Sequence, residues 1–408
     1  MRVLFVATPN SVHTARWIGQ FADLGWDLHV FPSAEFALHP QIGPLRYHPP
    51  LGSRSARHNR HVRQPLPTLL AGPWLRRARR LWPSLFEEAK RLAAVIAKVQ
   101  PDVVHSMEMQ QAGYLSAEAM PLVPGPRPPW LVTNWGSDIY FFGRMAEHRG
   151  RIEHVLRHCD YYDCECERDQ QLARDFGYDG PMFPVTPNAG GFDLKRCARL
   201  RQPGPTSARK MILVKGYQSW SGRAVTALRA IELAADALRG YEVGVYLANE
   251  DVELVAEAVG GSTGLPIKIL PKLPHEEMLR RHGSARMSIG VSATDGLSTS
   301  FLEALVMGAF PIQSHHAAAA EWIEDGKSGL IIDPDDPGRL AEAIRRVATD
   351  DELVDSAAAI NDETCRRRLA ADVVREQAIA MYQAIADDSV NTKTRPADLE
   401  SPRQHNAA

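Results

Sequence analysis

The sequence has few cysteines, and they form no regular pattern. There are five in 408 residues: Cys159, Cys164, Cys166, Cys197 and Cys365. An odd number at irregular spacing argues against a disulfide framework and favours a reducing compartment. The Cys164-Glu-Cys166 pair lacks the second pair of ligands that a zinc site needs, so we interpret all five cysteines as structural.

Long apolar runs and a strong net charge are also missing. No stretch of about 18 apolar residues is present, which excludes a transmembrane helix, and the first apolar run is too short for a signal peptide. The 47 basic and 49 acidic residues leave a net charge of -2, so there is no overall attraction to nucleic acid. A content of 44% hydrophobic residues excludes wholesale disorder. We therefore expect a cytoplasmic globular protein that does not bind nucleic acid.

Hydrophobic periodicity predicts an α/β architecture. An apolar run at residues 3–7, a helical pattern over 12–24 and a second run at 28–31 form a strand–helix–strand unit, which implies a right-handed crossover and a doubly wound sheet. Further strands are predicted at residues 102–105, 130–134, 161–164, 182–185, 211–214, 242–247, 267–270, 287–291, 310–313 and 329–332. Helices are predicted over residues 75–99, 168–176, 222–238, 300–307 and from 336 onward.

The length and the turn-rich segment near residues 188–209 predict two domains. We place a first domain at 1–190, a linker at 191–209, a second domain at 210–365, a helix at 366–386 and a disordered tail at 387–408. Both domains show the same alternation of strands and helices, so we expect two doubly wound, Rossmann-like domains facing one another across a cleft.

Two carboxylates flank a glycine- and hydroxyl-rich segment after the strand predicted at 287–291. Asp295 and Glu303 are eight residues apart, and Gly296 would let the backbone approach a ligand closely. Ligands of open parallel sheets bind beyond the carboxyl ends of the strands, and a helix start there offers free N–H groups to a phosphate. A purely structural alternative is a capping box formed by Ser300 and Glu303.

A cationic segment follows the strand predicted at 211–214. Lys215 ends that strand, and Arg223 opens the next helix after a loop with two glycines. Two such cations would neutralise a diphosphate. The alternative is that both charges are only solvated loop residues.

The paired acids and the segment behind them resemble a known family. Asp295, Glu303 and the following Gly308-Ala-Phe-Pro311 are similar to the core of retaining glycosyltransferase family 4, the glycosyl transferases group 1. Six further segments resemble motifs of this family and occur in the same order along the chain: residues 12–17, 102–105, 135–138, 187–194, 273–279 and 321–330. The resemblance implies the GT-B fold, an acceptor-binding first domain, a donor-binding second domain and a C-terminal helix that crosses back to the first domain.

The resemblance also implies roles for individual residues. Glu303 would bind the donor's ribose, Asp295 the transferred sugar, and Lys215 with Arg223 the leaving diphosphate. The β-phosphate would be held by the segment Gly296, Leu297, Ser298 and Thr299. The resemblance further implies retention of the anomeric configuration, with a donor phosphate oxygen taking the acceptor's proton. No metal and no cofactor besides the nucleotide-sugar donor are then required.

On the acceptor side, we predict roles for four residues. His13, Trp135 and Asp138 would line the cleft, and Asp138 and His105 are catalytic candidates. Each has a structural alternative: a packed histidine, or an aspartate that caps a turn. Trp135 stands where family members commonly have histidine, and Asp295 replaces the usual glutamate, so the acceptor and the sugar stay open.

A basic insert occupies residues 46–80, with nine arginines and no acidic residue. Peripheral contact with the anionic inner face of a membrane is predicted for Arg54, Arg57, Arg60, Arg63, Arg76, Arg77, Arg79 and Arg80. An anionic acceptor, nucleic acid or a merely solvated loop are the alternatives.

We therefore expect a retaining, metal-independent glycosyltransferase. It would move a sugar from a nucleoside-diphosphate sugar to a glycan, a lipid-linked or a small-molecule acceptor. Two alternatives stay open: a nucleotide-sugar epimerase of GT-B fold, and a non-catalytic subunit that only binds a sugar nucleotide.

Overall fold

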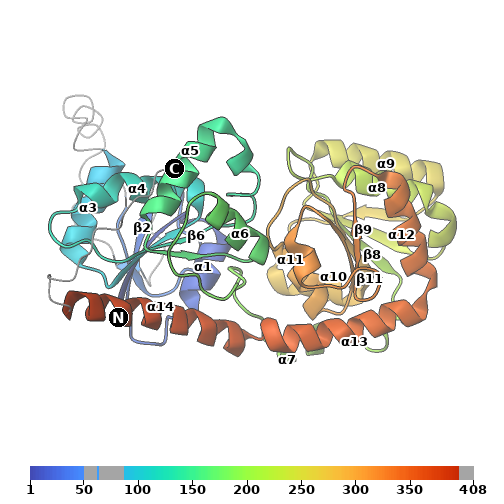
Figure 1. Cartoon of the computed structure of the whole chain (residues 1–408). Coiled ribbons are helices and arrows are strands. Elements are labelled where there is room, and N and C mark those ends of the chain that lie inside the picture. Colours follow the sequence, from blue (N-terminus) through green and yellow to red (C-terminus); the bar gives the residue numbers. More distant parts are fainter. Residues whose placement is uncertain (50–61, 64–86, 395–408) are drawn as a thin grey trace.

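The computed structural model describes residues 1–49, 62–63 and 87–394. Figure 1 shows two α/β domains side by side, with helices on both faces of each sheet. The basic insert lies almost entirely outside the described residues, so the predicted membrane contact through its arginines stays a prediction.

The N-terminal domain is built on a seven-stranded parallel sheet in the order β4-β3-β2-β1-β5-β6-β7. Its strands are β1 (Arg2–Ala7), β2 (Asp27–Pro32), β3 (Leu45–Tyr47), β4 (Val62–Arg63), β5 (Val103–Met107), β6 (Trp130–Thr133) and β7 (Tyr161–Asp163). Its main helices are α1 (Val12–Gly19), α3 (Glu88–Val99), the π-helix η3 (Met109–Gly113), α4 (Tyr114–Ala119), α5 (Ala146–His158) and α6 (Glu167–Asp175). The residues of β1, β5 and β6 are almost all buried because helices cover both faces of the sheet.

The C-terminal domain has a six-stranded parallel sheet in the order β10-β9-β8-β11-β12-β13. Its strands are β8 (Met211–Lys215), β9 (Glu242–Tyr246), β10 (Ile267–Ile269), β11 (Ala285–Gly290), β12 (Phe310–Ser314) and β13 (Leu330–Ile332). Its helices are α7 (Leu194–Leu200), α8 (Ala224–Leu233), α9 (Glu250–Thr263), α10 (His275–Ser284), α11 (Thr299–Val306), α12 (Pro337–Thr349) and α13 (Asp351–Arg368).

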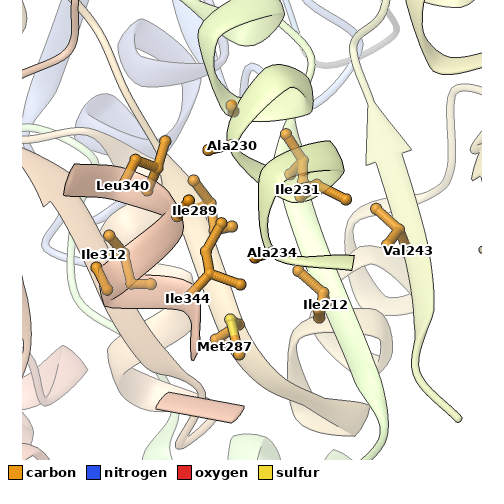
Figure 2. Packing of buried hydrophobic residues seen from close by; sticks show 14 of the residues in the cluster. Ile212, Ala230, Ile231, Ala234, Val243, Met287, Ile289, Ile312, Leu340 and Ile344 are labelled. Carbon is orange, nitrogen blue, oxygen red and sulfur yellow. The ribbon is translucent and has the colours of Figure 1, made fainter. Parts of the chain in front are cut away.

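The core of the C-terminal domain lies between the sheet and the helices α8 and α12. Figure 2 shows Ile212 and Ile289 of the sheet among Ile231 of α8 and Leu340 and Ile344 of α12. All five side chains are fully buried, and burial of each contributes about 1.5–3 kcal/mol. This core holds β8 and β11 in place. Lys215 is the last residue of β8, and Asp295 lies in the loop that follows β11.

The last helix, α14 (Ala371–Thr394), leaves the C-terminal domain and runs along the N-terminal domain (Figure 1). Its apolar residues Ala378, Met381, Tyr382 and Ile385 belong to the core cluster of the N-terminal sheet. The indole N–H of Trp17 donates a hydrogen bond of 2.9 Å to the Tyr382 hydroxyl. The chain therefore crosses between the domains twice, once at residues 188–192 and once at α14.

Several predicted boundaries differ from the structure. The segment 182–185 is no strand; it forms a single bridge between Met182 and Tyr162. Residues 45–47 form a strand that was not predicted, because the segment is too short to show a clear apolar run. The helical pattern at 222–238 divides into α8 and a 3-10 turn. The crossing helix starts at Ala371 and continues to Thr394, so the first part of the tail predicted to be disordered is helical.

Candidate active site

A cavity of about 930 Å³ lies between the two domains. It is found at the carboxyl ends of the parallel strands, where ligands of such sheets bind. The N-terminal domain contributes Asn10, His13, Arg16, His39, Trp135, Gly136 and Glu165 to its walls. The C-terminal domain contributes Lys215, Tyr246, Lys272, His275, Asp295, Leu297, Ser298, Thr299 and Glu303. The structure thus gathers most of the predicted donor-site residues around one space.

Lys215 and Asp295 meet in this cavity although they follow different strands. The Lys215 ammonium lies 3.4 Å from an Asp295 carboxylate oxygen and donates a hydrogen bond of 3.1 Å to the Ser298 hydroxyl. Because β8 and β11 are neighbours in the sheet, their carboxyl-terminal loops are adjacent. A cation, a carboxylate and a hydroxyl are therefore held together at the start of α11.

The start of α11 has the features of a phosphate site. Ser298 is the N-cap residue, and its side chain caps none of the helix N–H groups. The Thr299 hydroxyl is buried and has no hydrogen-bond partner among the described residues. The first N–H groups of a helix are unpaired and lie at its positive end, which favours an anion.

Glu303 lies one turn further along α11 and is almost fully buried. His275 at the start of α10 hydrogen-bonds one carboxylate oxygen at 2.8 Å, and buried His282 lies 3.8 Å from the other. Burial alone would raise the pKa of Glu303, but the His275 hydrogen bond and the nearby charges of His282 and Arg16 lower it below its usual value. The capping-box alternative is wrong, because α11 begins at Thr299 and Glu303 contacts His275 instead of its own helix start.

Glu165 brings a carboxyl group from the N-terminal domain to the same loop. One of its oxygens accepts the Asn188 N–H at 3.0 Å, and the carboxyl group also accepts the N–H of Leu297 in the C-terminal domain. Burial raises its pKa to about 8, and the charge of Asp295 acts in the same direction. Glu165 is therefore mostly protonated at neutral pH and links the two domains.

His13 and Trp135 line the cavity from the N-terminal domain, and their role on the acceptor side stays a prediction. Their rings lie 5.6 Å apart, and the Trp135 indole N–H is buried without a partner among the described residues. Burial, followed by the charge of Arg16, lowers the pKa of His13 to about 4. His13 is thus neutral at physiological pH.

His105 does not reach the cavity, which corrects the prediction of a catalytic role. It lies in the middle of β5, two residues before the carboxyl end, and is fully buried. Its ring nitrogens hydrogen-bond the Tyr382 hydroxyl at 2.6 Å and the Thr133 hydroxyl at 2.7 Å. Burial lowers its pKa to about 3, so this histidine is a neutral packing residue under α14.

Asp138 and Arg223 are also engaged away from the cavity. The Asp138 carboxylate accepts the N–H groups of Trp135 at 2.8 Å and Met109 at 2.9 Å, the turn-capping role that was its alternative. Burial, followed by the charge of Glu108, raises the pKa of Asp138 well above its usual value. Arg223 pairs with Asp335 at 2.9 Å and donates to carbonyls of its own loop. Neither side chain lines the cavity, which corrects the predicted catalytic role of Asp138 and the predicted diphosphate contact of Arg223.

The domains contact each other directly beside the cavity. Arg168 at the start of α6 donates hydrogen bonds to the carbonyls of Asp295 at 3.1 Å and His316 at 2.9 Å. Glu321 accepts the backbone N–H groups of Glu167 and Arg168 at 2.8 and 3.0 Å. These contacts join the two domains directly, and we refer to this state as the closed arrangement.

Arg16, Glu165 and His275 line the cavity and were not predicted as site residues. Arg16 belongs to the 12–17 motif and His275 to the 273–279 motif, so both segments carried a signal. Glu165 lies between Cys164 and Cys166, a pair that by itself indicates only an incomplete zinc motif. Nothing in that pattern indicated a contact with Leu297, because the two residues are far apart in the sequence.

The cysteines, the adjacent histidines His315 and His316, and the helices bear on possible disulfides, metal sites and membrane spans. The cysteines are all free and buried. The rings of His315 and His316 lie 3.9 Å apart, and no cluster of three or more metal-ligating side chains occurs within residues 1–49, 62–63 and 87–394. In the same part of the chain, every helix is too short or too polar to cross a bilayer.

Comparisons with known proteins agree with this geometry. The family described as Glycosyl transferases group 1 matches residues 247–363, and the family described as Glycosyl transferase 4-like matches residues 74–161. A D-inositol 3-phosphate glycosyltransferase from a Nocardioides species is 30% identical over 120 residues. That segment covers 29% of this chain and 26% of the relative, so the match spans about a quarter of the relative's length.

Solved structures with the same architecture cover nearly the whole chain. Sucrose-phosphate synthase from Thermosynechococcus elongatus has a TM-score of 0.67 at 15% identity, covering 95% of this chain and 100% of that one. The HepE protein of Anabaena, solved in complex with UDP-glucose, has a TM-score of 0.66 at 15% identity and covers 94% and 100%. Trehalose 6-phosphate synthase from Burkholderia multivorans has a TM-score of 0.68 at 13% identity and covers 97% and 99%. The predicted GT-B fold is confirmed, and two segments of the chain match the families described as Glycosyl transferases group 1 and Glycosyl transferase 4-like.

Proposed function

We propose that the protein is a retaining glycosyltransferase that uses a nucleoside-diphosphate sugar and needs no metal. The observation that carries the proposal is the arrangement at the start of α11, where Lys215, Ser298 and the unpartnered Thr299 hydroxyl surround free helix N–H groups. Such a site suits the phosphates of a donor. The UDP-glucose complex of the HepE structure, which has the same fold, supports a nucleotide sugar as the ligand.

The cavity has room for the other two parts of the donor. Glu303, held by His275, would accept hydrogen bonds from the ribose hydroxyls, and Asp295 would accept those of the sugar. His13 and Trp135 face this sugar from the N-terminal domain, where the acceptor would enter. An aromatic ring beside a polar wall suits the flat apolar face and the hydroxyl rim of a sugar acceptor.

The proposed transfer balances without an added acid or base. The bond between the anomeric carbon and the β-phosphate oxygen breaks, and its electron pair stays on the diphosphate. The acceptor oxygen bonds to the same face of that carbon, and its proton passes to the departing phosphate oxygen. Lys215 and the N–H groups of α11 would stabilise the charge that develops on the leaving group, where fixed donors contribute most.

One experiment separates the three functions that the sequence left open. The protein is incubated in EDTA with UDP-, GDP-, dTDP- and ADP-sugars, with and without sugar acceptors, and the products are followed by proton NMR. A glycosidic product with the donor's anomeric configuration supports the proposal. A changed sugar still attached to its nucleotide would instead identify an epimerase. Tight binding of a nucleotide sugar without any turnover, across a broad acceptor panel, would identify a non-catalytic subunit.

A further inference from the structure

Arg16 is a cation of the cavity that has no direct ion-pair partner among the described residues. It lies on α1, is half-buried and lines the cavity wall. Its charge interacts with that of Glu303, but no ion pair or hydrogen bond joins its guanidinium to any described residue. Partly burying a charge without a partner is costly, so such a group inside a cavity indicates an anionic ligand.

The surroundings of His13 show where this cation lies. The charges that act on the His13 ring are those of Arg16, Asp295, Glu303 and Lys215. His13 and these four groups all line the same cavity, so Arg16 and Lys215 border one space. Arg16 belongs to the N-terminal domain and Lys215 to the C-terminal domain, so the two cations approach the cavity from opposite walls.

The C-terminal domain by itself brings only part of the charge that a diphosphate requires. Lys215 is shared with Asp295 at 3.4 Å, and the Arg223 guanidinium is bound to Asp335. The other lysine of the cavity, Lys272, is exposed on the rim. A half-buried guanidinium is the better partner for a phosphate, because its planar fork donates two hydrogen bonds at once.

We propose that Arg16 is the second cation of the donor-diphosphate site, supplied across the cleft by the N-terminal domain. The inference rests on the proposed function and assigns Arg16 the role that the sequence suggested for Arg223. It has a mechanistic consequence. The charge that develops on the leaving diphosphate meets both cations only in the closed arrangement, so domain closure completes the catalytic site.

The test measures how much binding each phosphate adds. A nucleoside, its monophosphate and its diphosphate, with the base that the unmodified protein prefers, are titrated calorimetrically into the unmodified protein, Arg16→Gln and Arg16→Lys. The control is Arg199→Gln, which removes an exposed arginine of α7. We expect Arg16→Gln to weaken diphosphate binding by about 10- to 100-fold, the loss of one charge-assisted contact, and to leave nucleoside binding unchanged.

The Arg16→Lys variant and the comparison of ligands decide between a charge effect and misfolding. Arg16→Lys keeps the charge and should bind the diphosphate with intermediate affinity, which also guards against a misfolded glutamine variant. Diphosphate binding by Arg16→Gln within twofold of the unmodified protein would overturn the inference. An equal loss of affinity for the nucleoside and the diphosphate in Arg16→Gln would also overturn it. The same holds if Arg223→Gln, and not Arg16→Gln, lost the extra affinity that the phosphates provide. If the unmodified protein bound no nucleoside diphosphate, the proposed function would fail first, and the role of Arg16 would fail with it.

Discussion

Gly296 and Gly136 pack against each other across the domain boundary so closely that no side chain fits between them. A Cβ atom added at Gly296 would lie 2.7 Å from the Cα atom of Gly136 and 3.3 Å from an oxygen of Glu165. Gly136 itself has a φ of +48°, a conformation that suits glycine. The loop that leads into α11, where we propose the phosphate site, therefore forms part of the contact between the domains.

Gly296→Ala should oppose this closed arrangement. Overpacking at such a contact costs about 1–3 kcal/mol, so we expect donor affinity to fall by roughly 5- to 150-fold while each domain stays folded. Small-angle X-ray scattering should show a larger radius of gyration, and calorimetry the weaker binding. Gly261→Ala is the control, since a Cβ atom there meets nothing within 4 Å. Normal donor affinity in Gly296→Ala would contradict the closed form as the binding form.

Tyr382→Phe tests the anchor between α14 and the N-terminal sheet. The variant removes a buried hydroxyl that hydrogen-bonds both Trp17 and His105. Two buried polar atoms lose their partner, so the free energy of unfolding should fall by about 1–3 kcal/mol. Urea denaturation measures the change. Tyr217→Phe, at a residue that is 44% exposed, should change stability by less than about 0.5 kcal/mol. Equal stability of both variants would show that the Tyr382 hydroxyl anchors nothing.

Glu165 should make stability depend on pH. Burial raises its pKa from the usual 4.5 to about 8 in the folded protein, so the folded state binds this proton more tightly than the unfolded chain. Its stabilisation is therefore full below about pH 4.5 and is lost as the pH rises through about 8.

The comparison with Glu165→Gln isolates this contribution, because the amide does not titrate. Burial also raises the pKa of Asp163 and of Glu108, each to about 7, so these groups make stability fall with rising pH as well. Both groups are present in the unmodified protein and in Glu165→Gln, so their effect cancels in the comparison. Urea denaturation at about pH 5 and about pH 8.5 should show a larger loss of stability for the unmodified protein than for the variant. Parallel losses in both proteins would rule out a buried, protonated Glu165.

The sequence was a good guide to the fold because the core strands are short continuous apolar runs between turns. Strands such as β1 and β8 are buried on both faces and stand out for that reason. β3 escaped notice because an exposed Arg46 interrupts its three residues. The far end of α14 was missed because a polar segment with little apolar periodicity resembles a tail.

The predicted residues that reach the cavity lie at or just after the carboxyl end of a strand. Lys215 and Asp295 occupy such positions and line the cavity. His105 lies two residues earlier within β5, so its ring packs under α14. Asp138 and Arg223 also come after strands, but other groups engage their side chains: the Met109 N–H binds Asp138, and Asp335 binds Arg223. These partners are distant in the sequence, so the spacing of residues does not reveal them.

The most direct measurement of the central claim is calorimetric titration of UDP, GDP, dTDP and ADP and their sugars in EDTA. Glu303→Gln provides the test variant, because Glu303 lines the cavity and is proposed to bind the ribose. Glu257→Gln, an exposed acid on α9, is the matched control. The account predicts that one base binds without metal, and that Glu303→Gln alone weakens this binding by about 10-fold or more. Absence of binding across the panel, or equal binding by Glu303→Gln, would contradict a nucleotide-sugar site in this cavity.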